Sequence, residues 1–145
     1  MERIKRIVFV FVLSCVMFPL SSLCEETDGS EACDYDWTPV MEAIIEVESG
    51  GNSRAVSGNS AGVMQITPVL VEQCNIIMKR RKSKKRYRLS DRFSVAKSKE
   101  MFLLIQSYFN PTNNVEKAIR MWNGGLNYSL KRTQRYFERV MSKLN

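Results

Sequence analysis

One glutamate, Glu48, lies among apolar residues of a predicted helix and directly before a glycine-rich turn. At about 100° per residue, Glu48 falls on the same arc as Ile44 and Ile45, whereas Glu42 and Glu46 fall on the opposite face. Burial and the negative end of the helix dipole both raise the pKa of a carboxyl group. The pattern therefore predicts a glutamic acid that can act as a general acid. The alternative is a structural carboxylate that pairs with an arginine or caps a neighbouring helix.

The helix that carries Glu48 is one of several that the sequence predicts, and the fold class is all-α. Thr38 as N-cap and Pro39 at the first helical position start it. A polar loop over 50–61 and a short extended or turn segment over 62–66 follow. Further helices are predicted to start at Thr67 and Ser94, a short one leads into residue 122, and a last one covers about 127–143. Alternating strand patterns are not convincing anywhere in the sequence.

Residues 1–24 have the pattern of a secretory signal peptide. Three basic residues precede an apolar run of 14 residues over 7–20, which is too short to span a bilayer comfortably. We expect export to the periplasm or cell envelope, with no transmembrane span in the mature chain. Lipoprotein anchoring at Cys24 is the alternative, although Leu23 is a poor fit to the small residue that lipid-modifying processing prefers. An acidic linker over 25–36 and a catalytic domain over 37–145 complete the predicted organisation.

The cysteines and the absence of histidine limit which catalytic sites, metal sites and disulfides the chain can form. The chain contains no histidine, which excludes Ser-His and Cys-His triads and any histidine-ligated zinc site. Cys24, Cys33 and Cys74 follow the apolar run, and export permits a disulfide. Cys33 with Cys74 is the pairing that we expect, although Cys74 also fits the apolar face of its own helix.

Three motifs occur in a fixed order: Glu-Ser-Gly-Gly-Asn at 48–52, Gly-Val-Met-Gln-Ile-Thr-Pro at 62–68, and Trp-Asn-Gly-Gly at 122–125. Together with Ala-Val-Ser at 55–57 they resemble the lytic transglycosylase (SLT) family over about residues 37–128. The resemblance implies the all-α fold of goose-type lysozyme. It also implies cleavage of the bond between N-acetylmuramic acid and N-acetylglucosamine in peptidoglycan. The small size and the Trp-Asn-Gly-Gly variant resemble members that serve conjugation or secretion complexes.

The resemblance also implies roles for individual residues. Glu48 would protonate the glycosidic oxygen and then take a proton from the C6 hydroxyl of the sugar, which closes a 1,6-anhydro ring without water, metal or organic cofactor. The residues expected to bind substrate are Ser49, Asn52, Gly62, Met64, Gln65, Trp122 and Asn123. Ser49 and Asn52 also fit ordinary turn chemistry, and Met64 also fits a core position. Trp122 replaces the usual tyrosine, which leaves the role of that hydroxyl open, while an indole can still stack on a sugar.

Ordinary glycosidases need two carboxyl groups, and no acidic residue after Glu48 lies in a motif for a second one. Two rivals remain beside the transglycosylase: a lysozyme-type hydrolase of the same fold, and a non-catalytic peptidoglycan-binding assembly protein. A second carboxylate that positions water would favour the hydrolase.

The chain is basic, with 22 Lys and Arg against 15 Asp and Glu and a net charge of +7. Eight of the ten residues over 79–88 are basic. Peptidoglycan is anionic, so a basic surface raises encounter rates with it. Nucleic-acid binding is the rival interpretation, which export disfavours. The same run of charges also fits a solvated loop, or a docking site for a cell-envelope secretion or conjugation complex.

Overall fold

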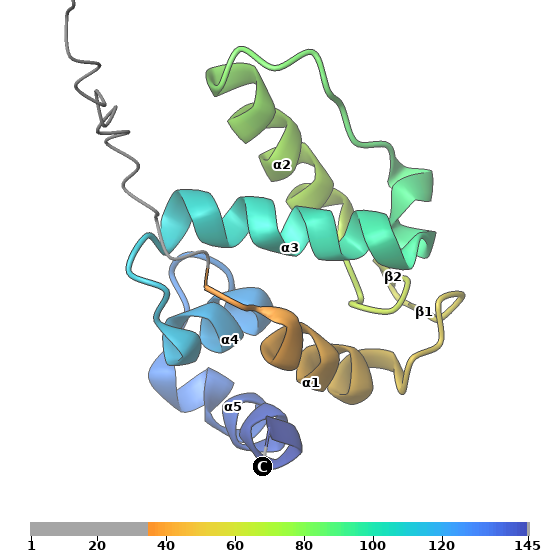
Figure 1. The fold of residues 1–145 in the computed structure, drawn as a ribbon. Helices are drawn as coiled ribbons and strands as arrows, with labels where there is room; N and C mark the ends of the chain where they lie inside the picture. The colour runs from red at the N-terminus through yellow and green to blue at the C-terminus, as the bar shows by residue number, and fades with distance from the viewer. Residues whose placement is uncertain (1–34, 145) are drawn as a thin grey trace, which may run out of the picture. The chain divides into compact units, whose positions relative to one another are not determined.

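Five α-helices form most of the part of the chain that the computed structural model describes, residues 35–144 (Figure 1). They are α1 Thr38–Ser49, α2 Pro68–Arg80, α3 Val95–Phe109, α4 Val115–Gly124 and α5 Leu130–Leu144. A 3-10 helix, η1, covers Leu89–Phe93. The strands β1 Val56–Ser57 and β2 Ser60–Ala61 pair antiparallel in a two-residue hairpin, which the sequence did not predict. The predicted all-α class is confirmed.

Side-chain caps start two of the helices where the sequence predicted them. The Thr67 hydroxyl accepts the backbone N–H of Leu70 at 3.2 Å and starts α2. The Ser94 hydroxyl accepts the backbone N–H of Lys97 at 3.4 Å and starts α3. For α1 the predicted cap is wrong by one position, because Thr38 is already the first helical residue and Trp37 is the N-cap.

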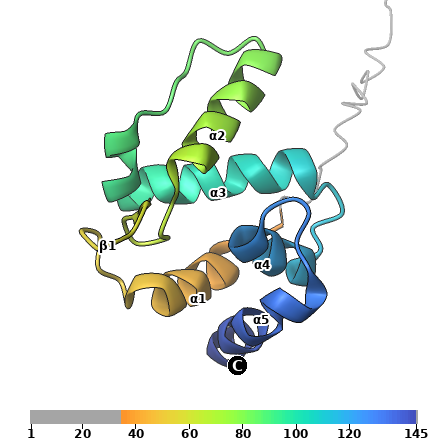
Figure 2. The same cartoon turned by 180° about the vertical axis from the view of Figure 1, so that it is seen from behind.

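The helices lie in two groups (Figures 1 and 2). In one group α5 packs on α1 and α4, and in the other α2 and η1 pack on α3. Aromatic rings join the two groups through the core. The ring centroid of Phe102 on α3 lies 5.6 Å from that of Trp37 and 5.2 Å from that of Trp122 on α4. One hydrophobic core therefore supports both groups.

A buried arginine fixes α5 against α4. The guanidinium of Arg120, which is 4 % exposed, pairs with Glu116 and donates to the Thr133 hydroxyl and to the Leu130 carbonyl. A buried charge is tolerated when its hydrogen bonds are made. Leu130, where α5 begins, has an exposed side chain. Thr133, Tyr136 and Val140 form the buried face of α5.

Cys74 is a free thiol in the core of the α2 group. Burial raises the pKa of this thiol to about 12. Among the described residues Cys74 has no disulfide partner, and its alternative position on the apolar face of α2 is confirmed. Its expected partner, Cys33, lies outside the described residues, as do Cys24 and the predicted signal peptide. Across residues 35–144, none of the helices combines the length and the apolarity needed to cross a membrane.

Candidate active site

Glu48 lies in the last turn of α1, which ends when Gly50 adopts a left-handed conformation with φ 59°. Its side chain is half-buried, and its carboxylate Oε1 accepts a hydrogen bond from the Tyr136 hydroxyl at 2.7 Å. Burial raises the pKa of Glu48, while the hydrogen bond from Tyr136 and the positive charge of Arg139 act in the opposite direction. The carboxyl group is thus held in place, partly desolvated and able to exchange a proton.

Tyr136 is the partner that the sequence did not reveal. It lies on the buried face of α5 and is 8 % exposed. Burial and the neighbouring Glu48 raise the pKa of its hydroxyl, so the group stays protonated and donates. The signal in the sequence is weak, because Tyr136 follows a basic stretch and is 88 residues from Glu48. Only the packing of α5 on α1 brings the two together.

Arg139, one turn beyond Tyr136, also contacts the end of α1. Its guanidinium Nη2 donates to the backbone carbonyl of Val47 at 3.1 Å. That carbonyl belongs to the last turn of the helix, where the dipole is negative and a cation is favourable. Arg139 therefore holds a positive charge close to Glu48.

The loop of residues 62–66 is tied to α1 and to α4 through two successive carbonyls. The Ser49 hydroxyl donates to the Val63 carbonyl at 2.8 Å. The indole Nε1 of Trp122 donates to the Met64 carbonyl at 3.2 Å. The first, second and third sequence motifs therefore meet at this loop. These two donors hold its backbone beside the end of α1.

The backbone of η1 passes so close to residue 62 that only glycine, which has no side chain, fits there. Gly62 is buried with φ 79°, and a Cβ built on it would lie 1.7 Å from the Arg92 carbonyl oxygen. The Gln65 side chain, half-buried, closes the same turn: its Nε2 donates to the carbonyls of Gly62 at 3.0 Å and Ala55 at 3.3 Å. Met64 is fully buried and packs in the core. These three residues shape the loop in this structure, and their contact with substrate stays a prediction.

Two predicted residues are exposed beside this arrangement. The Asn52 side-chain Oδ1 accepts the backbone N–H of Arg54 at 3.0 Å, which is a local turn contact. Asn123 lies exposed near the end of α4, and among residues 35–144 it has no side-chain hydrogen bond. Glu48 is held by Tyr136 and not by the Asn123 amide. The amide of Asn123 is thus free to contact a ligand.

Five acidic residues follow Glu48 in the chain: Glu72, Asp91, Glu100, Glu116 and Glu138. Four of them have other partners: the Arg88 N–H for Asp91, Lys85 and Lys97 for Glu100, Arg120 for Glu116, and Gln134 for Glu138. Within the described part of the chain none of the five forms a hydrogen bond with Glu48. The geometry thus isolates a single half-buried carboxyl group beside the three motifs.

The family model for the transglycosylase SLT domain matches residues 30–143, which is most of the chain. The chain belongs to the SLT domain family. Members of this family are lytic transglycosylases, enzymes that act on peptidoglycan. No curated protein and no solved structure gave a significant match to the chain. The SLT domain therefore carries lytic transglycosylase activity on peptidoglycan, in agreement with the resemblance of its motifs.

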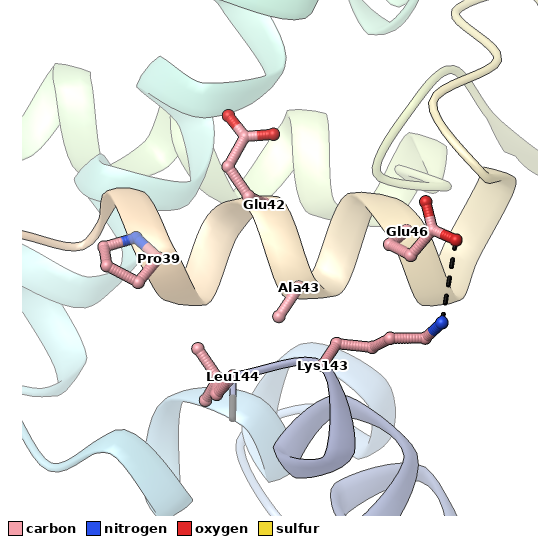
Figure 3. Close-up of a pocket in the computed structure, with 6 residues that line it drawn as sticks. All are labelled: Pro39, Glu42, Ala43, Glu46, Lys143 and Leu144. Atoms are coloured by element: carbon pink, nitrogen blue, oxygen red, sulfur yellow. Dashed lines mark ion pairs between the residues drawn. The ribbon is translucent and has the colours of Figure 1, made fainter.

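A pocket on the surface of this SLT domain is separate from that arrangement. Its lining comes from the solvent-facing side of α1 and from the end of α5: Pro39, Glu42, Ala43, Glu46, Lys143 and Leu144 (Figure 3). The ammonium of Lys143 pairs with Glu46 at 3.7 Å across it. Glu48 does not line this pocket, which is therefore no candidate for the catalytic centre.

Proposed function

We propose that the chain is an exported lytic transglycosylase in which Glu48 acts first as general acid and then as general base. The substrate is the bond between N-acetylmuramic acid and N-acetylglucosamine. The observation that carries this proposal is the half-buried Glu48, whose pKa is raised by burial and whose Oε1 is occupied by the Tyr136 hydroxyl. With Oε1 accepting that bond, Oε2 is the oxygen left to hold the transferable proton.

In the first step Glu48 donates its proton to the oxygen of the glycosidic bond. The bond from C1 of the muramic sugar to that oxygen breaks, and its electron pair leaves with the N-acetylglucosamine hydroxyl. The positive charge that develops at C1 is stabilised by the carbonyl oxygen of the sugar's own N-acetyl group. Tyr136 remains hydrogen-bonded to the carboxylate that forms, and charge-assisted bonds of this kind are stronger than neutral ones.

In the second step the Glu48 carboxylate takes the proton of the C6 hydroxyl. The C6 oxygen attacks C1, the 1,6-anhydro ring closes, and Glu48 is protonated again for the next cycle. No water is consumed. One carboxyl group in two roles is consistent with Glu48 standing apart from the other acidic side chains, four of which have partners of their own.

The other predicted residues have supporting roles in this proposal. Ser49 and Trp122 fix the 62–66 loop through its carbonyls, and Gly62 lets that loop pass close to η1. The exposed amides of Asn52 and Asn123 contact the sugar. Export is inferred from residues 1–24. Service to a conjugation or secretion complex stays a prediction, as does the alternative of anchoring at Cys24.

Digestion of purified sacculi tests the proposal. Mass spectrometry of the products should find 1,6-anhydro-muramic ends, which are lighter by one water than the reducing ends of a hydrolase. Reducing ends would move the chain to the lysozyme-type hydrolases. Binding to sacculi without released products would favour the non-catalytic assembly protein.

A further inference from the structure

The end of α2 and the connection from it to η1 carry a dense group of positive charges, residues 79–88, here called the basic segment (Figure 1). Eight of its ten residues are Lys or Arg, and it contains no acidic residue. Among the ion pairs of residues 35–144, only Lys85 of this segment has a carboxylate partner, Glu100. The other seven cations have no ion pair in this part of the chain, and such a concentration of positive charge attracts anions.

Contacts with α3 hold part of the basic segment in place. The guanidinium of Arg80 donates to the Tyr108 hydroxyl at 2.8 Å, and that of Arg81 donates to the Ser107 hydroxyl at 3.0 Å. Both guanidinium carbons lie 5.9 Å from the centroid of the Tyr108 ring. Two cations are thus positioned side by side on one tyrosine.

The far end of the basic segment is fastened to α2. The Asn75 side chain accepts the Tyr87 N–H at 2.8 Å and donates to the Tyr87 carbonyl at 2.9 Å. The Tyr87 side chain is buried at 5 % exposure. Because both ends of the segment are anchored by these contacts, the backbone between them has a defined conformation and the cations on it have defined positions. This organisation distinguishes the segment from a merely solvated loop.

The aromatic and apolar content of the basic segment indicates which class of anionic partner it fits. Proteins that bind single-stranded nucleic acid offer exposed aromatic rings for bases to stack on. Here Tyr87 is buried and Tyr108 is half-buried beneath two guanidinium groups. A membrane-surface element combines basic residues with an apolar face, and the segment itself has no exposed apolar side chain. Spread positive charge with no exposed ring or apolar side chain of its own suits carboxylates that are dispersed on a flexible polymer; the exposed apolar side chains nearby, Leu89 and Phe93, belong to η1.

We propose that the basic segment binds the carboxylates of the stem peptides of peptidoglycan and holds the domain on the polymer outside the catalytic site. This rests on the proposed function, which supplies the substrate. The length of α2 separates the first part of the segment from the catalytic arrangement. The helix starts directly after the 62–66 loop and has 13 residues, so at about 1.5 Å per residue its far end, with Lys79 and Arg80, lies roughly 20 Å away from that loop. The last residues of the segment return toward η1, where Arg92 contacts the loop.

A charge-neutral variant and a matched control test the proposal. The variant carries Lys79→Gln, Lys82→Gln and Lys84→Gln, three exposed residues whose ammonium groups have no ion pair in the described part of the chain. The control removes the same charge from α5 with Lys131→Gln, Arg132→Gln and Arg135→Gln, which are also exposed. Co-sedimentation with sacculi is measured over a range of salt concentrations. The same sacculi after amidation of their carboxyl groups give the chemical control.

We expect the variant to bind native sacculi roughly five-fold more weakly at low salt, the order that three exposed charge contacts give, with a flatter salt dependence. The α5 control should bind as the wild type does. Amidated sacculi should bind the wild type at least as weakly as native sacculi bind the variant, because the variant keeps five of the eight basic residues. Relative to the wild type, the variant should lose more activity on sacculi than on a soluble glycan strand stripped of its peptides.

Several results would overturn the proposal. They are an equal loss in the α5 control, unchanged binding of the wild type to amidated sacculi, or an equal loss of turnover on the peptide-free glycan. Tighter retention on vesicles of anionic phospholipid than on sacculi would assign the segment to a lipid surface. Co-sedimentation measures binding independently of cleavage. A wild type that binds sacculi through their carboxylates but forms no anhydro ends would therefore refute the proposed function and still support the binding role of the basic segment.

Discussion

The hydroxyl of Tyr136 donates to Oε1 of Glu48 at 2.7 Å and joins the middle of α5 to the end of α1. This bond opposes the effect of burial on the carboxyl group, because a donor stabilises the ionised form while desolvation favours the protonated form. Arg139 acts in the same direction as Tyr136. The pKa of Glu48 is therefore set by a balance between its burial and two groups of α5.

Tyr136→Phe should lower activity by roughly ten-fold, since a buried hydrogen bond to a charged group contributes about 1.5–3 kcal/mol in typical cases, and about 1.4 kcal/mol is a factor of ten. The ring and its packing stay. The pKa of Glu48 should rise because a donor to its ionised form is gone, so the basic limb of the pH–rate profile should move to higher pH. Steady-state rates over a pH series check this. An unchanged rate and an unmoved basic limb would mean that Tyr136 acts only through the packing of its ring.

Arg139→Gln should also move the basic limb to higher pH, because the neighbouring positive charge lowers the pKa of Glu48. The exposed Arg135→Gln, on the same helix and with the same loss of charge, is the matched control. Rates at several pH values and at two salt concentrations compare the two variants. Equal shifts in both would show that the overall charge of α5, and not the position of Arg139 beside Val47, controls the carboxyl group.

Gly62→Ala should destabilise the domain strongly, because its φ of 79° is unfavourable for alanine and the Cβ would meet the Arg92 carbonyl oxygen at 1.7 Å. Gly58→Ala is the control, since Gly58 has φ 56° but nothing within 4 Å of its Cβ position. The control should cost about 1–2 kcal/mol of unfolding free energy from the left-handed backbone alone, and Gly62→Ala clearly more. Chemical denaturation measures both. Equal losses would show that the loop can move away from η1.

The sequence predicted those features that depend on local chemistry. The caps Thr67 and Ser94 are local, and so is the glycine turn after Glu48. The hairpin was missed because two-residue strands leave no alternating pattern. The partners of Glu48 were missed for another reason: Tyr136 and Arg139 reach it only through the packing of α5, which depends on the buried Arg120 network. Substrate contacts of the predicted site residues stay predictions, because the loop geometry explains most of them without a ligand.

Glu48→Gln keeps the volume of the side chain but removes the transferable proton. Loss of general acid catalysis costs about 10²–10⁴-fold in rate, and a larger loss is expected here because the same group acts in both steps. The release of 1,6-anhydro products from sacculi measures it. Glu46→Gln, on the solvent-facing side of α1, is the matched control and should retain activity. Full activity in Glu48→Gln would contradict the assignment of the catalytic acid.

The same variant should change stability in a defined direction. The folded-state pKa of Glu48 is raised above its ordinary value of 4.5, so the folded state binds a proton more tightly than the unfolded chain does. The stability that this group contributes is fully present below the unfolded pKa and is lost as the pH rises through the folded pKa. Glutamine does not ionise, so Glu48→Gln avoids the loss of stability that the wild type undergoes when the half-buried carboxyl group is deprotonated. Its free energy of unfolding should therefore exceed that of the wild type at neutral pH, and the difference should shrink as the pH is lowered toward 4.5. Thermal or urea denaturation at a series of pH values measures the difference, and a variant that is less stable at neutral pH would show that the carboxylate is a structural ion-pair group of α5.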